Sequence, residues 1–153
     1  TEEEARAAAS DLKDVGNEAF KAGDTDGAIA KYTQALKLIK AATGSGDSVL
    51  YANRAAAFIA CKRFVPACRD AILSAEEDPD YWKAYWRQGV ALMSMQGKRF
   101  RTQQAIKAFE SCLKCSTLPE KTRPSVEAEL AKARARYEQQ DAETPMPEAC
   151  ALM

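Results

Sequence analysis

The sequence predicts an all-α fold built from consecutive pairs of amphipathic helices. Apolar residues recur every three or four positions through most of the chain, which is the period of a helix face. The chain also resembles itself, because segments that start at Gly16, Arg54 and Gly89 repeat one order of small and large apolar residues. Each repeated segment contains two helical patterns and no strand pattern. An array of helix pairs is therefore the expected architecture.

The spacing of small residues defines the repeated unit. The first small residue of each segment is Gly16, Ala55 or Gly89, at separations of 39 and 34 positions. The second small residues, each at the start of a new helical pattern, are Ala28, Ala67 and Ala105. A unit of 34 residues explains these separations if the chain carries short insertions within 43–47 and 97–100, where glycine and polar residues are typical of turns.

The helices follow one another with clear boundaries. A turn at Gly23-Asp24 separates the two helices of the first pair. Asp78-Pro79 ends the second pair, since proline cannot continue a helix and biases its predecessor away from the α region. The third pair starts at about Tyr81. We expect the small residues to let the helices of a pair approach closely, while large residues fill the space between pairs.

A last helix is expected after Pro119, with an apolar stripe on one side only. The residues of this stripe are Val126, Leu130, Ala133 and Tyr137. Charged residues lie outside the stripe, as is typical of an element that caps a stack of repeats. We therefore divide the chain into an N-terminal helical extension at 1–9, a repeat domain with its capping helix at 10–140, and a flexible tail at 141–153 that contains two prolines.

The composition excludes several classes of function. With 153 residues, 46% of them hydrophobic, the chain is long enough for one domain with its own core. Lys+Arg 22 balance Asp+Glu 22, so the broad positive field of a non-specific nucleic-acid binder is missing, and we expect no nucleic-acid partner. The chain has no His, the commonest general base near neutral pH and the commonest metal ligand. We expect no enzymatic activity, no cofactor and no bound metal.

The cysteines favour a reducing compartment. There are five, an odd number in a chain that is large enough to fold without disulfides, so we expect free thiols and a cytoplasmic location. Cys112 and Cys115 have the C-x-x-C spacing but no second pair follows them, and we interpret them as ordinary thiols rather than a metal or redox site. The start of the chain lacks a signal-peptide pattern, and no apolar stretch reaches the roughly 20 residues of a membrane span.

The repeated residues resemble the tetratricopeptide-repeat family over about residues 10–138. The matching positions are Leu12, Gly16, Ala28, Tyr32, Ala35, Tyr51, Ala55, Ala67, Pro79, Tyr85, Gly89, Ala105 and Phe109. The departures are the two insertions, Ala71 where the second unit usually has an aromatic residue, and Ser74 where it usually has alanine. The resemblance implies three helix-turn-helix repeats and a capping helix, stacked in a right-handed superhelix whose first helices line a concave groove.

In that geometry, five polar side chains face the groove. Lys13 and Asn17 are four positions apart on the first helix, Asn53 lies in the second repeat, and Lys83 and Arg87 are four positions apart in the third. No carboxylate on the same faces neutralises the three cations. Two like charges at this spacing cost a helix about 0.2–0.5 kcal/mol, which an anionic partner would offset. Taken alone, each of these residues is more simply interpreted as a solvated surface residue.

As a set, these residues resemble the two-carboxylate clamp of chaperone-binding tetratricopeptide domains. The resemblance implies a co-chaperone or adaptor that binds the C-terminal Glu-Glu-Val-Asp peptide of heat-shock protein 70 or heat-shock protein 90. Lys13, Asn17 and Asn53 would hold the terminal carboxylate, and Lys83 and Arg87 the acidic side chains. Secondary groove residues, which ordinary repeat packing would equally explain, are Phe20, Ala56, Trp86 and Val90.

The last four residues form a C-a-a-X pattern that ends in Met153 and favours farnesylation of Cys150. A chance tetrapeptide is the alternative. One prenyl chain gives only marginal attachment, and the neighbouring residues Asp141, Glu143 and Glu148 are acidic. We therefore expect weak, reversible membrane contact, and only if Cys150 is prenylated.

Two other functions stay open at the level of the sequence. The domain could be a general protein-protein scaffold that binds folded partners outside the groove, with the five residues incidental. It could also be the repeat module of a larger enzyme.

Overall fold

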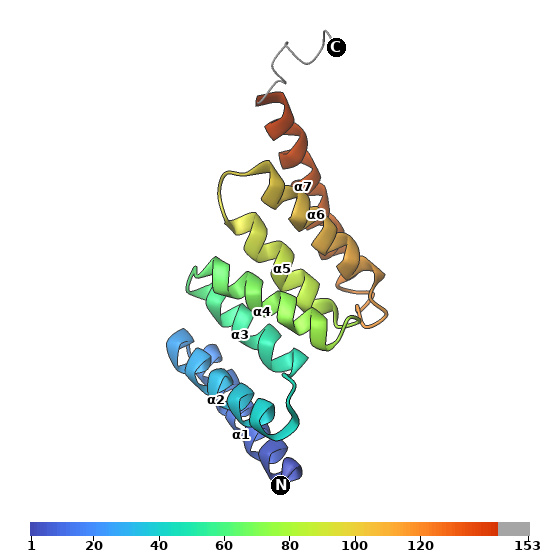
Figure 1. Ribbon diagram of the computed structural model, residues 1–153. Coiled ribbons are helices and arrows are strands. Elements are labelled where there is room, and N and C mark those ends of the chain that lie inside the picture. The colour runs from blue at the N-terminus through green and yellow to red at the C-terminus, as the bar shows by residue number, and fades with distance from the viewer. Residues whose placement is uncertain (144–153) are drawn as a thin grey trace.

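The computed structural model describes residues 1–143 and contains seven helices and no strand in that range (Figure 1). The helices are α1 (Glu2–Lys21), α2 (Thr25–Thr43), α3 (Ser48–Ala60), α4 (Phe64–Glu77), α5 (Trp82–Ser94), α6 (Arg99–Lys114) and α7 (Arg123–Glu143). The predicted all-α fold class is therefore confirmed.

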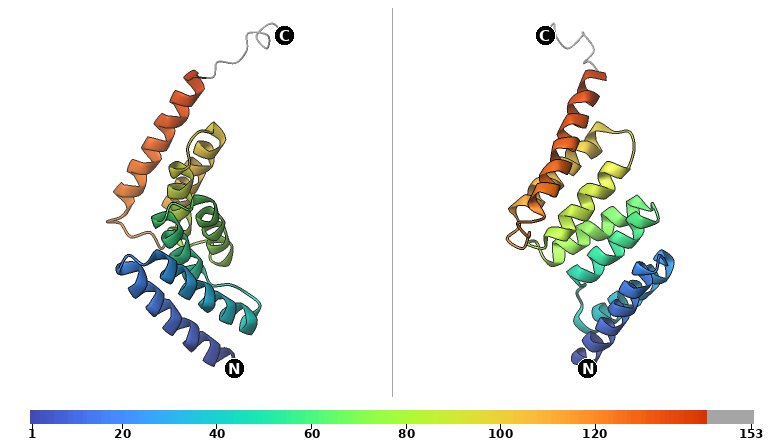
Figure 2. Two further views of the ribbon diagram at one scale, coloured as in Figure 1. Left: turned by 90° about the vertical axis from the view of Figure 1, so that its left-hand side faces the viewer. Right: turned by 180° about the vertical axis from the view of Figure 1, so that it is seen from behind.

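Each helix packs mainly against its neighbours in the chain. The strongest packing joins α1 to α2, α3 to α4, and α5 to α6, while α7 lies against α6. In every view of Figures 1 and 2 the N-terminus and the end of α7 lie at opposite ends of an elongated molecule. The first helices of successive pairs also touch, since α1 contacts α3 and α3 contacts α5. Side chains on these three helices can therefore share one surface.

The predicted turns lie between helices. Gly23 has a φ of +82° and Asp24 caps α2 by accepting a hydrogen bond of 2.8 Å from the Gly27 amide. Both segments expected to hold insertions are helix connections, although α6 already begins at Arg99, inside the second of them. α4 ends at Glu77, directly before Asp78-Pro79, as expected.

The chain ends differ from the expected domain boundaries. α1 crosses residue 10 without interruption, and Ala9 is buried in the same cluster as Ile39 and Leu50. Residues 2–9 are therefore the first turns of α1, and among them Ala9 is buried in the core. α7 continues to Glu143, three residues beyond the expected boundary at 140, so residues 141–143 are helical. The rest of the expected tail lies outside the described residues.

Glycines facing aromatic rings set the distance within two of the helix pairs. A Cβ on Gly16 would lie 2.6 Å from the Tyr32 ring, and one on Gly89 would lie 2.4 Å from the Phe109 ring. Both rings are fully or almost fully buried, so neither has room to retreat. The helices can approach this closely only because these positions carry no side chain.

Polar side chains inside the second pair are all satisfied. The guanidinium of Arg54 donates to both carboxylate oxygens of Asp70, at 2.6 and 2.8 Å, and to the Thr33 hydroxyl at 3.1 Å, which joins α2, α3 and α4. This hydrogen bond to Asp70 raises the pKa of Arg54. Ser74, the departure from the expected alanine, is fully buried and its hydroxyl donates to the carbonyl of Ser48 at 2.7 Å. The serine therefore fits the interface without an unsatisfied group.

α7 covers the last pair with the predicted stripe. Val126, Leu130 and Ala133 are buried against α6, and Tyr137 is half-buried under the guanidinium of Arg99, 4.0 Å above its ring. Among residues 1–143, none of the helices combines the length and the apolar character that a membrane span requires.

We predict that Gly89→Ala lowers the free energy of unfolding by about 1–2 kcal/mol. Alanine favours a helix by about 1 kcal/mol over glycine. Overpacking usually costs about 1–3 kcal/mol, and the overlap with the immobile Phe109 ring places Gly89→Ala in the upper part of that range, at about 2–3 kcal/mol. Urea titration followed by circular dichroism measures the difference, with Gln103→Ala, an exposed position on α6, as the control that stays within about 0.5 kcal/mol of the wild type. A Gly89→Ala chain that is as stable as the wild type would show that α5 and α6 can move apart at no cost in stability.

Candidate functional site

The five clamp residues predicted from the sequence lie on the three first helices that touch one another. Lys13 and Asn17 are on α1, Asn53 is on α3, and Lys83 and Arg87 are on α5. All five side chains are half-buried. The contacts between these helices bring the five residues onto neighbouring helices.

Asn17, Asn53 and Arg87 line a single cavity of about 210 Å³. Its remaining walls are Phe20, Lys21, Tyr32 and Ala56. Residues from four helices therefore meet around one small opening. The cavity combines two side-chain amides and two cations with the edges of aromatic and aliphatic side chains, so it can bind a group that is anionic at one end and apolar at the other.

A hydrogen-bond network fixes the orientation of the two amides. The side-chain oxygen of Asn17 accepts from the Tyr32 hydroxyl at 2.7 Å and from the Asn53 amide nitrogen at 3.3 Å. With its oxygen occupied, Asn17 can offer only N–H groups to a ligand. Burial of Tyr32 raises the pKa of its phenol, so the hydroxyl keeps the proton that it donates. The cavity is thereby organised to donate hydrogen bonds.

Arg87 is the most poorly solvated cation of the set. Its Nε is buried and has no hydrogen-bond partner among the described residues. Burial lowers the pKa of the guanidinium, and the Tyr81 phenol partly opposes this shift. A buried donor without an acceptor is costly, because it loses its hydration and gains nothing in return. A carboxylate bound next to Arg87 would remove this cost.

No carboxylate within residues 1–143 forms an ion pair with Lys13, Lys83 or Arg87. By contrast, Arg54 is tied to Asp70 in the protein interior. The three cations of the candidate clamp are therefore available to an external anion.

Lys13 and Lys83 do not line the cavity that holds the other three residues. Lys13 lies one helical turn before Asn17 and borders a separate hollow of about 110 Å³ with Ser10 and Asp47. Lys83 lies one turn before Arg87, with its ammonium 5.9 Å from the centre of the Trp82 ring. The structure thus gathers three of the five residues around one cavity, while each of the two lysines lies one helical turn away along its helix.

The secondary groove residues separate into two groups. Phe20 and Ala56 line the cavity, and Phe20 is 37% exposed. Trp86 and Val90 pack instead against the core of the last helices, where the Trp86 ring lies 5.8 Å from that of Phe109. Trp86 and Val90 therefore take part in ordinary repeat packing, which is the alternative that the sequence also allowed.

Two lining residues were missed by the sequence analysis as site residues. From the sequence, Tyr32 was identified only as a packing residue of the repeat. A buried tyrosine needs a partner for its hydroxyl, however, and this requirement points to a polar neighbour such as Asn17. Lys21 adds a further cation to the cavity, and its ammonium pairs with Glu18 at 3.1 Å. No sequence pattern singles out Lys21.

The cysteines within residues 1–143 are free thiols. Cys112 and Cys115 are buried, and their thiols donate to the carbonyls of Trp82 and Ser111. No group of three or more potential metal ligands occurs among the described residues. Burial raises the pKa of Cys112 to about 12 and also raises that of Cys115. Cys150, the expected lipidation site, lies outside the described residues.

Comparison with known proteins supports the predicted repeat type. No family model matches the chain. The small glutamine-rich tetratricopeptide repeat-containing protein 2 of Saccharomyces cerevisiae is 37% identical over 110 residues, which cover 72% of this chain and 29% of that protein. The chain therefore spans less than a third of the length of this curated relative.

Solved structures of tetratricopeptide-repeat domains have the same architecture. The Sgt2 domain of Aspergillus fumigatus is 28% identical, with a TM-score of 0.74 over 91% of this chain and 86% of its own. The first such domain of Spaghetti (RPAP3), bound to the HSP90 peptide SRMEEVD, is 30% identical, with a TM-score of 0.71 over 86% and 94%. The second domain of human RPAP3, in complex with the HSP70 peptide SGPTIEEVD, is 27% identical, with a TM-score of 0.68 over 88% and 98%.

The helices described here and these comparisons define a tetratricopeptide-repeat type of domain. Several of the similar domains carry chaperone peptides in their structures. The chain is thus similar to adaptor domains that bind chaperones.

We predict that Cys112 resists alkylation by iodoacetamide in the folded chain. A thiol with a pKa of about 12 is roughly one ten-thousandth ionised at pH 8, and only the thiolate reacts. Labelling should accelerate as the pH rises toward 12, and peptide-resolved mass spectrometry measures it. Alkylation in urea, where burial is lost, is the control. Rapid labelling of folded Cys112 at pH 8, or saturable Zn²⁺ binding that Cys115→Ala abolishes, would support a functional C-x-x-C pair instead.

Proposed function

We propose that this domain is a non-enzymatic co-chaperone or adaptor module that binds the C-terminal Glu-Glu-Val-Asp tail of heat-shock protein 90 or heat-shock protein 70. The observation that carries the proposal is the set of three cations without acidic partners among the described residues, beside two amides of which Asn17 is oriented to donate, on the adjoining helices α1, α3 and α5. The similarity to domains bound to HSP90 and HSP70 peptides supports it.

In this proposal α1 to α6 form three tetratricopeptide repeats and α7 caps them. The repeats stack in a right-handed superhelix, and the peptide lies in the groove lined by α1, α3 and α5. Such a domain would act in the cytoplasm, where the tails of these chaperones are accessible. The boundaries of the domain follow the helices, from α1 to α7.

A carboxylate clamp requires hydrogen-bond donors that carry no negative charge themselves. A chain that ends in aspartate presents two carboxylates a few ångströms apart, both acceptors only when ionised. Lys13, Asn17 and Asn53 would hold the main-chain carboxylate, while Lys83 and Arg87 would hold acidic side chains. Hydrogen bonds that involve charged groups contribute about 1.5–3 kcal/mol each before the entropy of binding is subtracted. A net of about −8 kcal/mol corresponds to micromolar affinity.

The apolar walls of the cavity would contact the residues before the terminal aspartate. Phe20 and Ala56 lie beside the amides and Arg87, and in the proposed complex they would contact the penultimate valine side chain. Farnesylation of Cys150 would add weak, reversible membrane contact to this function and does not compete with it.

We predict micromolar binding of the peptide SRMEEVD that depends on its free C-terminus. Amidation of the peptide removes one carboxylate, and Lys13→Ala or Arg87→Ala removes a charged donor, so each change should weaken binding at least tenfold. Fluorescence anisotropy with a labelled peptide measures the Kd. The affinity should fall with rising salt, because salt screens the attraction between the cations of the site and the carboxylates of the peptide.

Lys37→Ala is the matched control for the two cation variants. Lys37 is exposed on α2 and lines none of the cavities described here, so its loss should leave the Kd unchanged. Binding that survives amidation, or that is indifferent to both Lys13→Ala and Arg87→Ala, would remove the clamp and favour a scaffold that uses another surface.

We predict that Tyr32→Phe weakens binding of SRMEEVD about three- to tenfold. Without the hydroxyl, the Asn17 oxygen keeps only its longer bond to Asn53, and the amide is free to turn its oxygen toward the peptide. The change corresponds to about 1 kcal/mol, the contribution of one hydrogen bond. Tyr85→Phe is the control, since it removes a similar bond of 2.8 Å to the Pro79 carbonyl, away from the cavity. Equal affinities for both variants would show that Tyr32 does not position Asn17.

A further inference from the structure

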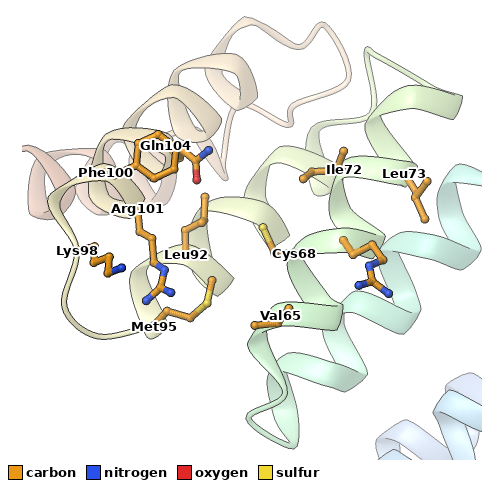
Figure 3. Close-up of a pocket in the computed structure, with 11 residues that line it drawn as sticks. Val65, Cys68, Ile72, Leu73, Leu92, Met95, Lys98, Phe100, Arg101 and Gln104 are labelled. Atoms are coloured by element: carbon orange, nitrogen blue, oxygen red, sulfur yellow. The ribbon is translucent and has the colours of Figure 1, made fainter.

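An apolar groove lies on the second helices of the array, apart from the candidate clamp. Its volume is about 600 Å³, and α4 forms one wall while α6, the end of α5 and the connection between them form the other (Figure 3). Figure 3 shows Val65 and Cys68 on α4 opposite Leu92 and Met95. None of the five clamp residues lines this groove.

The second wall of the groove contains a helical turn that the other helix pairs do not have. α6 begins six positions before its small residue Ala105, whereas α2 and α4 begin only three positions before theirs. The Arg101 guanidinium donates to the Gln96 carbonyl at 3.1 Å and so braces the connection to this turn. Close packing of a helix pair does not require the extra turn, since the first two pairs form without it. The extra turn and the connection before it contribute Met95, Lys98, Phe100 and Arg101 to the lining.

Large apolar side chains of the groove are exposed to solvent. Phe100 is 64% exposed, Val65 is 63% exposed and Ile72 is 42% exposed. Val65, Cys68 and Ile72 are spaced as i, i+3 and i+7, so they follow one face of α4 for about 10 Å. Single exposed apolar residues are common, but a hollow lined by several of them is typical of a binding surface.

The charged residues that line the groove are all cations. They are Arg69, Lys98 and Arg101, and no carboxylate is among the lining residues. Neither Arg69 nor Lys98 forms an ion pair within residues 1–143. Because the whole chain has as many acidic as basic residues, this excess of positive charge is local. The complementary occupant is apolar on one side and carries carboxylates beside its apolar side.

The acidic residues of α4 do not neutralise these cations. Asp70 is buried in its ion pair with Arg54, and Glu77 accepts a hydrogen bond of 2.8 Å from the Gly46 amide. Glu76 is exposed one turn beyond Ile72 and does not line the groove.

A second hollow extends the groove along α6. It has a volume of about 300 Å³ and shares Phe100 and Gln104 with the groove. Lys107 adds a further cation, and this lining again includes no carboxylate. The cationic, partly apolar surface therefore continues for several turns of α6.

We propose that this groove binds an acidic amphipathic helix of a partner protein. The described residues contain no strand, so no sheet edge is present on which an extended segment could pair. A small molecule would stay largely uncovered, because Val65 and Phe100 leave the groove open. A third helix can instead lie between α4 and α6, with apolar side chains at i, i+3 or i+4, and i+7 in the groove. Its flanking Asp or Glu side chains would face Arg69 on one wall and Lys98 on the other.

Occupation of the groove does not depend on the candidate clamp. The clamp residues lie on α1, α3 and α5, while the cations of the groove lie on α4, on α6 and directly before α6. One chain could therefore hold a peptide terminus and a partner helix at the same time.

A synthetic helix tests the proposal on the full chain. The probe is a labelled, C-terminally amidated peptide of about 18 residues, long enough to form a helix, with leucines at i, i+4 and i+7, glutamates along both flanks and alanines elsewhere. We expect a Kd of about 100 μM or lower by fluorescence anisotropy, as for a weak, small interface. The methyl NMR signals of Val65, Ile72 and Met95 should shift on binding. A peptide with lysines in place of the glutamates should bind at least tenfold more weakly.

Substitutions of exposed residues separate the apolar and the charged contributions. Ile72→Glu and, independently, Phe100→Glu should weaken the acidic peptide at least tenfold, and circular dichroism verifies that each variant is folded. Leu38→Glu is the matched control, because Leu38 is 39% exposed on α2 and lies outside the groove.

Charge reversal gives a gain of binding that a loss of folding cannot imitate. The double variant Arg69→Glu/Lys98→Glu should prefer the lysine peptide over the acidic peptide. Lys37→Glu/Lys40→Glu changes the charge equally at exposed positions of α2 and should keep the preference of the wild type.

Four results would overturn the proposal. The first is a wild-type chain that does not bind the acidic peptide or that binds both peptides equally. The second is binding that Ile72→Glu and Phe100→Glu leave unchanged. The third is competition by saturating SRMEEVD, which would place the acidic peptide at the clamp cations. The last is a concentration-dependent dimer that Ile72→Glu abolishes, since a second copy of the chain would then cover the groove.

Discussion

The contact between a glycine and an aromatic ring is the constraint on which the rest of the molecule depends. Gly16 admits the Tyr32 ring to a distance at which a Cβ would overlap it, and Gly89 does the same for Phe109. The Gly16 contact also brings the Tyr32 hydroxyl to Asn17. The packing of α1 on α2 therefore orients the first amide of the candidate site. In the proposed function, stability and binding would be coupled through one side chain, that of Tyr32.

Two arginines show how similar side chains take different roles. Arg54 is tied to Asp70 through two short hydrogen bonds and joins three helices. Breaking a buried pair of this kind leaves an uncompensated charge, which makes it a structural element. Arg87 is half-buried with an unsatisfied Nε and no acidic partner among the described residues. Desolvation without compensation makes Arg87 the cation that would gain most from an external carboxylate.

The two sides of the helix array have different chemistry. The first helices carry cations and oriented amides around a small cavity, which suits the charged end of a peptide. The second helices α4 and α6, together with the end of α5, line a larger apolar groove with a cationic border. Because each helix pair contributes one helix to each side, a repeat array can separate an electrostatic site from a hydrophobic one within 143 described residues.

The sequence by itself determined the helical class, the turns at Gly23 and Pro79 and the capping stripe on α7, because helix periodicity and turn chemistry are local. Through its resemblance to a known family, the sequence also suggested the five candidate clamp residues. It could not decide which of the five clamp residues share a cavity, since the contacts of α1 with α3 and of α3 with α5 join segments far apart in the chain. Only the tertiary structure separated Phe20 and Ala56, at the cavity, from Trp86 and Val90, in the core. The same holds for the role of Tyr32 and for the apolar groove between α4 and α6. A hydrogen bond between residues 17 and 32, or a hollow between α4 and α6, exists only once the helices have packed.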